Sequence, residues 1–350
     1  PYAPSFGRPD LRDKWKKLIY QKNPGLEEQP ISLPIVTSAL THALSIIGYL
    51  FIDQEDDVWV SDLYWGNYNL IFNNGLGANL EKFNLFENNH FGLASFRSSM
   101  MQKEKKKKIV LLNFPNNPTG YTPTVEEMLE IINILHASAE AGNELIVIAD
   151  DAYFGLVYEN GVELQSPFAY LANLHENILA IKVDGPTKED YAWGFRIGFI
   201  TYACKGGSKS LYQALESKTA GAIRGNISNA CNLTQSMLLK AYNHADYNQQ
   251  KQNKYELLKA RYQAVKNALQ KEKYQSYFYP YPYNSGYFMC IGLKENIDGE
   301  ELRQLLLKKY DTGVINMNNI IRIAFSAVAE NKIPLLFENI YLACQELKKN

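Results

Sequence analysis

The sequence predicts an α/β fold with a large domain and a smaller α+β C-terminal domain. The large domain is expected to hold a mostly parallel sheet sandwiched by helices. Short, continuously apolar runs alternate with helical patterns, which is typical of parallel strands buried on both faces. The 350 residues, at about 150 per domain, suggest two domains. We assign residues 1–243 to the large domain and residues 244–350 to the small one.

The large domain contains one apolar helix, one capped helix and several strand-like runs. The apolar helix covers residues 41–52. Thr124-Val125-Glu126-Glu127 is a capping box that begins the second helix, and Gly142 is its expected stop. The strand-like runs are residues 57–61, 109–112, 145–149, 178–183 and 197–201.

The sequence changes character near Asn243. Residues 247–273 are polar and strongly helical, and Leu258, Tyr262, Val265 and Leu269 form one apolar stripe. Short strands near residues 287–289 and 321–323 follow, and a helix closes the chain. This pattern predicts the small C-terminal domain.

Composition limits the partners. Lys plus Arg is 36 and Asp plus Glu is 37, which gives a net charge of −1. A near-neutral chain gives no electrostatic reason to expect nucleic acid or an anionic membrane as a partner. The lysine-rich run at residues 103–108 is interpreted as a solvated loop before a strand. No apolar run approaches the roughly 18 residues of a membrane span.

The cysteines and histidines suggest no metal site. The four cysteines are scattered, and the five histidines have no metal-ligand spacing. A reducing cytoplasm fits such cysteines better than a disulfide framework does. Because the chain begins with Pro1 and not Met, we expect that the natural N-terminal segment is missing.

Polar residues follow three of the expected strands. Asn117 follows the strand that begins at residue 109, Asp150 ends the next, and Lys188 lies shortly after the third. Ligands bind at the carboxyl ends of such strands. An amine there can form a Schiff base with an aldehyde cofactor, and a carboxylate can pair with a protonated ring nitrogen. The arrangement predicts a site for pyridoxal 5'-phosphate.

Three motifs in order carry a family resemblance. They are Asn-Pro-Thr-Gly at residues 117–120, Asp-x-Ala-Tyr at residues 150–153, and Lys188 with Arg-x-Gly at residues 196–198. With them the chain resembles the pyridoxal-phosphate-dependent aminotransferases of class I/II (fold type I), close to the aspartate and aromatic aminotransferases. The resemblance covers Tyr2 to about Arg322.

The resemblance implies roles for residues around the cofactor ring. Lys188 resembles the lysine that forms the Schiff base and moves the proton, and Asp150 the carboxylate that bonds the pyridine N–H. Asn117 and Tyr153 resemble the pair that hydrogen-bonds the ring's phenolic oxygen, and Trp65 the aromatic residue that stacks on the ring.

It also implies a phosphate site. Arg196 resembles the phosphate-binding arginine. Leu40, through its amide, and Thr41 resemble the loop that meets phosphate at a helix N-terminus, and Thr187 offers another hydroxyl. Tyr2 resembles a tyrosine that reaches the phosphate of the neighbouring subunit, so a homodimer is expected.

The substrates implied are amino acids and 2-oxo acids. Arg322 resembles the residue that clamps the substrate α-carboxylate, and Asn117 and Trp65 are also expected to bind substrate. Arg224 either reaches a distal carboxylate across the dimer or makes a structural ion pair, and both interpretations stay open. Aspartate, glutamate and aromatic amino acids are therefore the expected donors.

The chain departs from the family pattern at three positions. Gly185 replaces a phosphate-binding serine, and Leu40 brings no polar side chain to the phosphate loop. Tyr68 stands where a histidine often lies behind the pyridine aspartate, so we expect a hydroxyl in place of an imidazole. These changes leave the exact substrate open.

Two other functions remain as alternatives. A β-lyase or a decarboxylase would use the same lysine, aspartate and arginine set. An aminotransferase-like effector domain of a transcription regulator would carry a DNA-binding module ahead of residue 1. The retained substrate arginines count against the regulator, whereas the lyase and the decarboxylase share them and stay open.

Overall fold

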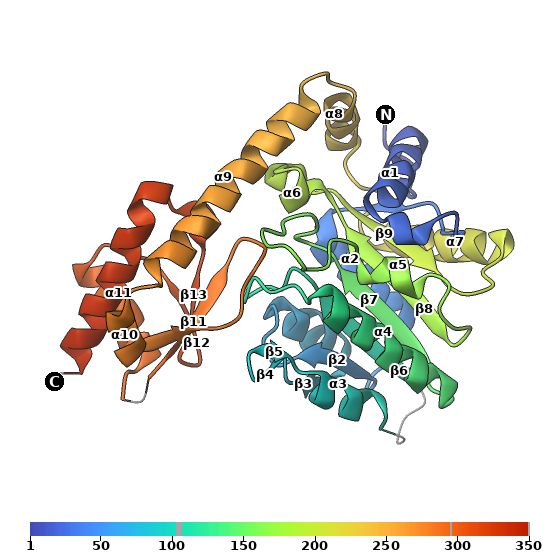
Figure 1. The fold of residues 1–350 in the computed structure, drawn as a ribbon. Coiled ribbons are helices and arrows are strands. Elements are labelled where there is room, and N and C mark those ends of the chain that lie inside the picture. The colour runs from blue at the N-terminus through green and yellow to red at the C-terminus, as the bar shows by residue number, and fades with distance from the viewer. Residues whose placement is uncertain (103–106, 295, 349–350) are drawn as a thin grey trace. The chain divides into compact units, whose positions relative to one another are not determined.

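The computed structural model describes residues 1–102, 107–294 and 296–348 (Figure 1). The chain forms two compact units. The large unit comprises Pro1–Phe114, Pro123–Gly155 and Gly161–Tyr247. The small unit comprises Pro115–Thr122, Leu156–Asn160 and Asn248–Asn350.

These units differ from two contiguous blocks of sequence. The small unit begins after Tyr247, a few residues later than the predicted boundary. It also contains residues 115–122 and 156–160, which the sequence places in the large domain. Most of the lysine-rich run, residues 103–106, lies outside the described residues.

The large unit is built on a sheet that, within the described ranges, has the strand order β1-β9-β8-β7-β6-β2-β3. All pairs among β2, β3, β6, β7 and β8 are parallel, whereas β9 is antiparallel to both of its neighbours. The predicted mostly parallel sheet is thus confirmed. The strands are β1 (Ile35–Thr37), β2 (Asp57–Ser61), β3 (Asn79–Phe83), β6 (Lys107–Asn113), β7 (Glu144–Asp150), β8 (Ile178–Asp184) and β9 (Gly198–Ala203), and β4 (Phe86–Glu87) pairs with β5 (His90–Phe91) beside them.

The short connection from β8 to β9 explains the antiparallel strand. It holds only α6 (Pro186–Glu189) and a 3₁₀ turn at Trp193–Phe195. Parallel pairing needs a crossover that carries the chain back along the sheet. Because this connection stays at the carboxyl end of β8, the chain enters β9 from that end.

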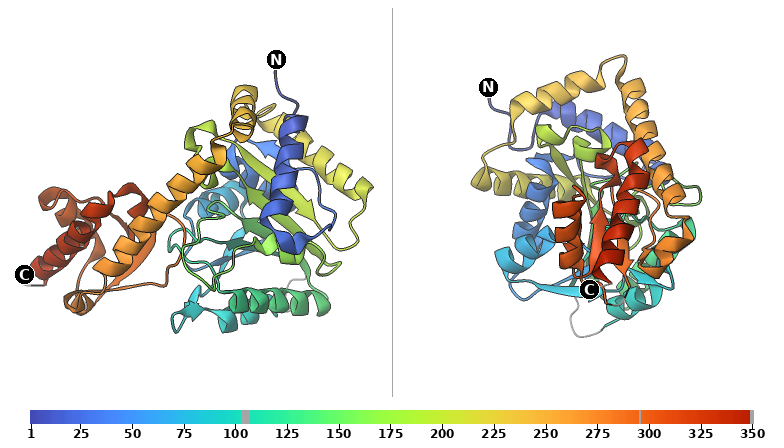
Figure 2. Two further views of the ribbon diagram at one scale, coloured as in Figure 1. Left: turned by 45° about the horizontal axis from the view of Figure 1, so that its top comes forward. Right: turned by 90° about the vertical axis from the view of Figure 1, so that its left-hand side faces the viewer.

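Helices cover both faces of the sheet (Figures 1 and 2). Helix α2 packs against β8, β9 and α7, while α4 and α5 contact β7 and β8. Trp15 of α1 stacks on Phe199 of β9 with ring centroids 4.3 Å apart. These helices are α1 (Pro9–Lys22), α2 (Ala39–Phe51), α3 (Leu93–Met100), α4 (Val125–Glu140), α5 (Pro167–Leu171), α7 (Lys209–Asn226) and α8 (Asn232–Tyr242).

The predicted capping box at the start of α4 is confirmed. The Thr124 hydroxyl accepts a hydrogen bond from the Glu127 amide at 3.2 Å, and the Glu127 carboxylate accepts one from the Thr124 amide at 2.9 Å. Two of the unpaired amides of the first turn are thereby satisfied. The helix ends at Glu140, and Gly142 follows with φ of 91°.

The small unit contains an antiparallel sheet whose described strands have the order β10-β11-β13-β12. Helix α9 ends before the predicted residue 273, because residues 272–276 form a separate 3₁₀ turn. Leu258, Tyr262 and Val265 of the predicted stripe are buried. The elements are α9 (Tyr247–Ala268), β10 (Phe278–Pro280), β11 (Met289–Leu293), α10 (Gly299–Lys309), β12 (Ile315–Met317), β13 (Ile320–Ile323) and α11 (Ile333–Leu347).

Candidate active site

The register of the sheet places the carboxyl ends of β6, β7 and β8 side by side. Asn113 of β6 pairs with Asp150 of β7, and Asp150 pairs with Val183 of β8. Lys188 lies on α6, which begins two residues after β8 ends. The structure therefore places the predicted carboxylate and the predicted amine at the same edge of the large unit's sheet.

Asp150 is buried, with 2% of its surface exposed. The Tyr68 hydroxyl donates to its Oδ2 at 2.5 Å, and the Ala152 amide donates to its Oδ1 at 3.2 Å. Burial raises the pKa of Asp150, while the Tyr68 hydrogen bond and the Lys188 charge act in the opposite direction. The hydroxyl expected at Tyr68 in place of an imidazole is confirmed as a partner of Asp150.

Tyr68 is itself held as a donor. Burial and the neighbouring Asp150 charge raise the pKa of Tyr68 well above its usual value. Its phenol therefore stays protonated and can only give its proton to the carboxylate in this contact. Trp65 lies edge-on to the Tyr68 ring, with centroids 5.6 Å apart.

Lys188 has an amine that is easier to deprotonate than an ordinary lysine. Burial lowers the pKa of Lys188, and the Arg196 charge lowers it further, against the attraction of Asp150. Its Nζ lies 4.9 Å from the centroid of the Tyr153 ring. A neutral amine is the nucleophilic form of lysine, so this environment suits covalent chemistry with a carbonyl group.

The N-terminus of α2 forms a cradle beside these residues. Ser38, its N-cap residue, makes no side-chain capping bond, and Ala39 has φ of 65°. A Cβ on Gly198 would lie 2.7 Å from the Ala39 carbonyl carbon, and a Cβ on Gly185 would lie 2.7 Å from the Ile197 carbonyl oxygen. Both glycines are therefore required by close backbone approach.

The side chains expected around this cradle differ in their surroundings. Thr41 is half-buried and Leu40 is buried. The Thr187 hydroxyl reaches only the Ile197 carbonyl, at 3.5 Å. Arg196 is exposed and has φ of 52°, a conformation that non-glycine residues rarely adopt. Uncapped amides at a helix N-terminus and a nearby guanidinium together favour an anion such as phosphate.

The small unit holds two further predicted residues in direct contact. Arg322 of β13 donates from Nη1 to the Asn117 Oδ1 at 3.0 Å, and its guanidinium lies 4.5 Å from the centroid of the Phe288 ring. Asn117 belongs to the tight loop of residues 115–122. At Gly120, where φ is 72°, a Cβ would lie 2.0 Å from the Phe288 carbonyl oxygen, so only glycine fits.

Two predicted residues lie on the surface. Tyr2 is 90% exposed. Arg224, in the last turn of α7, is exposed and donates to the Ser228 hydroxyl at 2.9 Å. Their expected roles across a dimer remain predictions.

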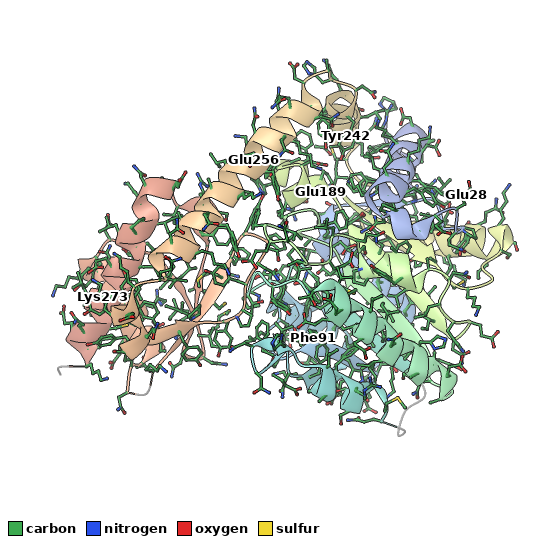
Figure 3. All side chains as sticks on the ribbon, in the orientation of Figure 1. Glu28, Phe91, Glu189, Tyr242, Glu256 and Lys273 are labelled. Carbon is green, nitrogen blue, oxygen red and sulfur yellow. The ribbon has the colours of Figure 1, made fainter. Side chains whose placement is uncertain are left out.

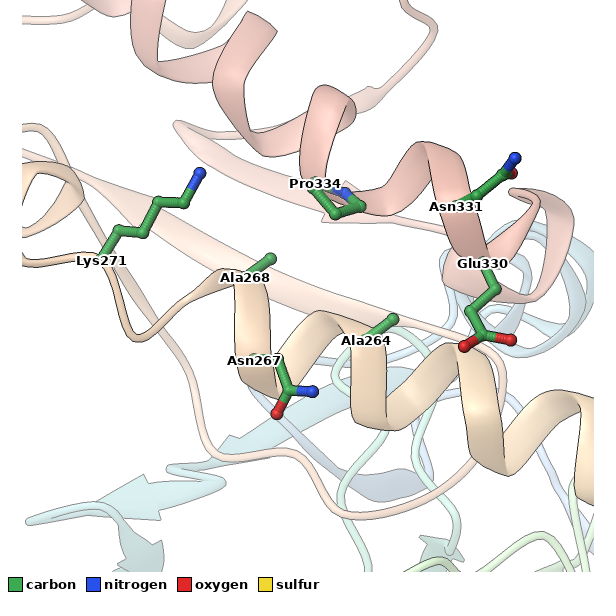
Figure 4. Close-up of a pocket in the computed structure, with 7 residues that line it drawn as sticks. All are labelled: Ala264, Asn267, Ala268, Lys271, Glu330, Asn331 and Pro334. Carbon is green, nitrogen blue, oxygen red and sulfur yellow. The ribbon is translucent and has the colours of Figure 1, made fainter.

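A surface pocket of about 670 Å³ lies elsewhere on the small unit, between α9 and the start of α11 (Figure 4). The side chains that line it include Asn267, Lys271, Glu330 and Asn331. None of the predicted site residues lines this pocket.

The chain belongs to the family described as aminotransferase class I and II, whose model matches residues 1–340. It is 26% identical to aspartate aminotransferase of Bacillus subtilis (strain 168) over 244 residues, which are 69% of this chain and 56% of that protein. The chain therefore spans about half the length of the curated relatives it matches. Within the described residues, no helix is long and apolar enough to cross a bilayer.

Solved structures support the fold. An aminotransferase from Anaerococcus prevotii DSM 20548 matches with a TM-score of 0.85 and 26% identity, over 98% of this chain and 82% of that one. Pyrococcus horikoshii kynurenine aminotransferase, solved with PMP, KYN and KYA, matches with a TM-score of 0.81 and 18% identity, over 99% of this chain and 82% of that one. The prediction of an aminotransferase fold is confirmed.

The large unit's residues fit the pyridoxal 5'-phosphate that this family uses. The fit rests on three features of this chain. Lys188 offers a depressed amine pKa, Asp150 offers a buried carboxylate held by Tyr68, and α2 begins with an uncapped turn. Sequence reasoning missed the charged residues behind these groups, Lys182 and Asp184, because a lysine or aspartate inside an apolar run gives no motif.

Proposed function

We propose that this chain is an aminotransferase that moves an amino group between an L-amino acid and a 2-oxo acid. The observation that carries the proposal is that Lys188, whose pKa is lowered by burial, and the buried Asp150 lie at the same edge of the sheet. When bound, pyridoxal 5'-phosphate supplies an aldehyde that accepts the amino group and a ring that withdraws electrons.

The chain's own groups then have defined tasks. Lys188 is a proton carrier, since burial lowers the pKa of its amine and makes the amine easier to deprotonate. Asp150, held by the Tyr68 donor, keeps a negative charge available for a protonated ring nitrogen. Tyr153, beside Lys188, and Asn117 are proposed to hold the phenolic oxygen.

Substrate binding is proposed for Arg322. Its guanidinium is held by Asn117 and stacked near Phe288, which presets a planar fork suited to a carboxylate. Aspartate, glutamate and aromatic amino acids are the proposed donors. Arg224 is exposed and donates to the Ser228 hydroxyl, so its guanidinium could still reach a distal carboxylate, and that role is part of the proposal.

A cytoplasmic homodimer completes the proposal, with Tyr2 and Arg224 acting in the partner's site. The 90% exposure of Tyr2 supports this assembly, as do the exposed apolar side chains of Leu233 and Met237 on α8. All four cysteines are free thiols, as a reducing compartment favours.

The proposal is tested by a single-turnover assay. The protein is loaded with pyridoxal 5'-phosphate, and L-aspartate, L-glutamate and L-tyrosine are added separately. We expect the absorbance of the aldehyde form to be replaced by that of the amine form, and 2-oxoglutarate to reverse the change. Release of pyruvate or carbon dioxide without this reversal would instead identify a lyase or a decarboxylase.

Arg224→Ala ranks the donors in the same assay. We expect it to slow the dicarboxylic donors more than tyrosine, because only they carry a distal carboxylate. Lys240→Ala, on the neighbouring helix α8, is the matched control for loss of one basic residue. Equal slowing of all donors would remove the proposed contact with substrate.

A further inference from the structure

A second group of charged residues is buried behind the candidate site. We call it the back cluster: Lys22, Asp151, Lys182, Asp184 and Glu189. Lys182 and Asp151 each expose only 1% of their surface. Four of these groups are buried and Lys22 is partly exposed. Buried ionisable groups are costly to desolvate, so their arrangement calls for a physical explanation.

Strand geometry separates this cluster from Asp150. Successive side chains of a strand point to opposite faces, so Lys182 and Asp184 of β8 share one face and Val183 lies on the other. Asp150 is paired with Val183, whereas Lys182 is paired with Ala149. The consecutive residues Asp150 and Asp151 thus serve opposite faces: Asp150 contacts Tyr68 and Asp151 contacts Lys182.

Lys182 is the shared cation of this face. Its Nζ contacts the Asp151 Oδ2 directly and lies 3.5 Å from the Asp184 Oδ2. The Ser166 hydroxyl donates to the Asp151 Oδ2 at 2.6 Å, and the other oxygen, Oδ1, has no hydrogen-bond partner. The charge of Asp151 is therefore balanced chiefly by one lysine.

Two residues of the back cluster, Asp184 and Glu189, lie just before and just after Lys188 in the chain, and both contact helix α1. Trp15 donates from Nε1 to Asp184 at 2.9 Å, and Lys22 pairs with Glu189 at 2.5 Å. Glu189, labelled in Figure 3, follows Lys188 directly on α6. The ends of β8 and α6 are thus tied to α1 on this face.

We propose that Lys182 is a positioning residue whose charge neutralises Asp151, so that the adjacent Asp150 stays ionised toward the cofactor ring. The inference rests on the proposed function. Two buried carboxylates in consecutive residues raise each other's pKa, and an unpaired Asp151 would push Asp150 toward its neutral acid. A neutral Asp150 could no longer hold a proton on the ring nitrogen.

The proposal predicts an asymmetry that a purely structural ion pair does not. Lys182→Met and Asp151→Asn both break the contact between the two side chains. Lys182→Met takes the shared lysine from both Asp151 and Asp184, and leaves the Asp151 charge unbalanced next to Asp150. Asp151→Asn instead removes that charge and leaves Lys182 paired with Asp184. Only the first change should affect Asp150.

The experiment uses the full chain loaded with pyridoxal 5'-phosphate that carries ¹⁵N in its ring. The ¹⁵N chemical shift reports whether the ring nitrogen is protonated, independently of turnover. We expect the protonated shift in the wild type and in Asp151→Asn, and a shift toward the unprotonated value in Lys182→Met. Transamination should fall about tenfold in Lys182→Met and stay within about threefold in Asp151→Asn.

The double variant Lys182→Met/Asp151→Asn removes both charges and guards against a single variant that does not fold. We expect it to regain the protonated shift and at least about a third of wild-type activity. Lys266→Met, which breaks the ion pair with Glu159 in the small unit, is the control for loss of one paired lysine.

The outcomes separate the two proposals. If Lys182→Met and Asp151→Asn change the shift alike, or the double variant regains nothing, Lys182 is only structural and the inference is wrong while the transaminase proposal stands. If the wild type binds the cofactor but transfers no amino group, the activity proposal fails, and the ¹⁵N shifts still decide the role of Lys182. If the wild type binds no cofactor, both are overturned.

Discussion

Asp150 and Asp151 are neighbours in the chain and almost equally buried, yet their surroundings differ. Asp150 accepts hydrogen bonds from Tyr68 and the Ala152 amide, and the Lys188 charge lowers its pKa. Asp151 is fixed by Lys182 and Ser166. The comparison teaches that burial alone does not assign a function to a carboxylate. The two carboxylates differ in what holds them: a phenol and an amide donate to Asp150, whereas a lysine cation pairs with Asp151.

Lys188→Ala gives the largest expected effect on the Asp150 face. Without the amine the proton carrier is lost, and we expect transamination to fall by at least about 10³-fold. Stopped-flow absorbance after addition of L-aspartate measures the rate. Lys205→Ala, on the loop after β9, is the control lysine. A Lys188→Ala protein that retains more than a tenth of the activity would contradict the assignment.

Replacing each aspartate by asparagine compares the two faces of the sheet directly. Asp150→Asn removes the charge that faces the ring, and we expect a loss of about 10²-fold in kcat/KM, typical of removing one preorganised electrostatic contact. Asp151→Asn, the matched variant on the other face, should change the rate little. Steady-state kinetics with L-aspartate and 2-oxoglutarate compare the two. Equal losses would mean that the two faces are not distinct.

Much of the fold and of the Asp150 face could be predicted from the sequence, whereas the Asp151 face could not. The strands β2, β6, β7, β8 and β9, the capping box at Thr124 and the positions of Asp150 and Lys188 follow from periodicity and motif order. The hydroxyl of Tyr68 was expected behind Asp150 from a single departure from the family pattern. Its contact with Asp150 is confirmed.

The contacts that could not be predicted depend on how strands and loops far apart in the sequence pair with one another. Lys182 lies within an apolar run, and nothing local shows that β7 and β8 pair so that it meets Asp151. The same holds for Asn117, whose loop follows a large-unit strand but folds with the small unit and contacts Arg322. Local patterns predict elements, whereas long-range pairing decides which charges meet.

Tyr68→Phe tests how the Asp150 charge is maintained, with a smaller effect. The hydrogen bond from Tyr68 lowers the pKa of Asp150, so its removal raises that pKa. A raised pKa means that Asp150 becomes ionised only at higher pH, and the acidic limb of the kcat/KM profile should move to higher pH. We expect a loss of about tenfold at pH 6 that becomes smaller at pH 8. Tyr64→Phe, whose ring stacks near Tyr68, is the control. An unshifted limb would contradict the role of this donor.

Asp184→Asn, on the opposite face, should change the pH dependence of the free energy of unfolding more than it changes the rate of transamination. Burial raises the pKa of Asp184 from the ordinary 3.8 to about 6, against the Lys182 charge. Between these values the folded protein holds a proton that the unfolded chain has lost, so the free energy of unfolding falls as pH rises through this window. The free energy of unfolding is therefore highest below about pH 4 and lowest above about pH 6, and the Asp184 contribution to this difference is roughly 3 kcal/mol.

An asparagine at position 184 cannot titrate, so this part of the pH dependence should disappear. Urea unfolding followed by circular dichroism at pH 4.5, 5, 6 and 7 measures it, with the wild type and Asp184→Asn compared at each pH. Asp246→Asn, an exposed acidic residue near the end of the large unit, is the control. Because Asp150 and Asp151 remain in both proteins, the difference between the curves isolates Asp184. Parallel curves would show that Asp184 is already ionised throughout this range and would contradict its raised pKa.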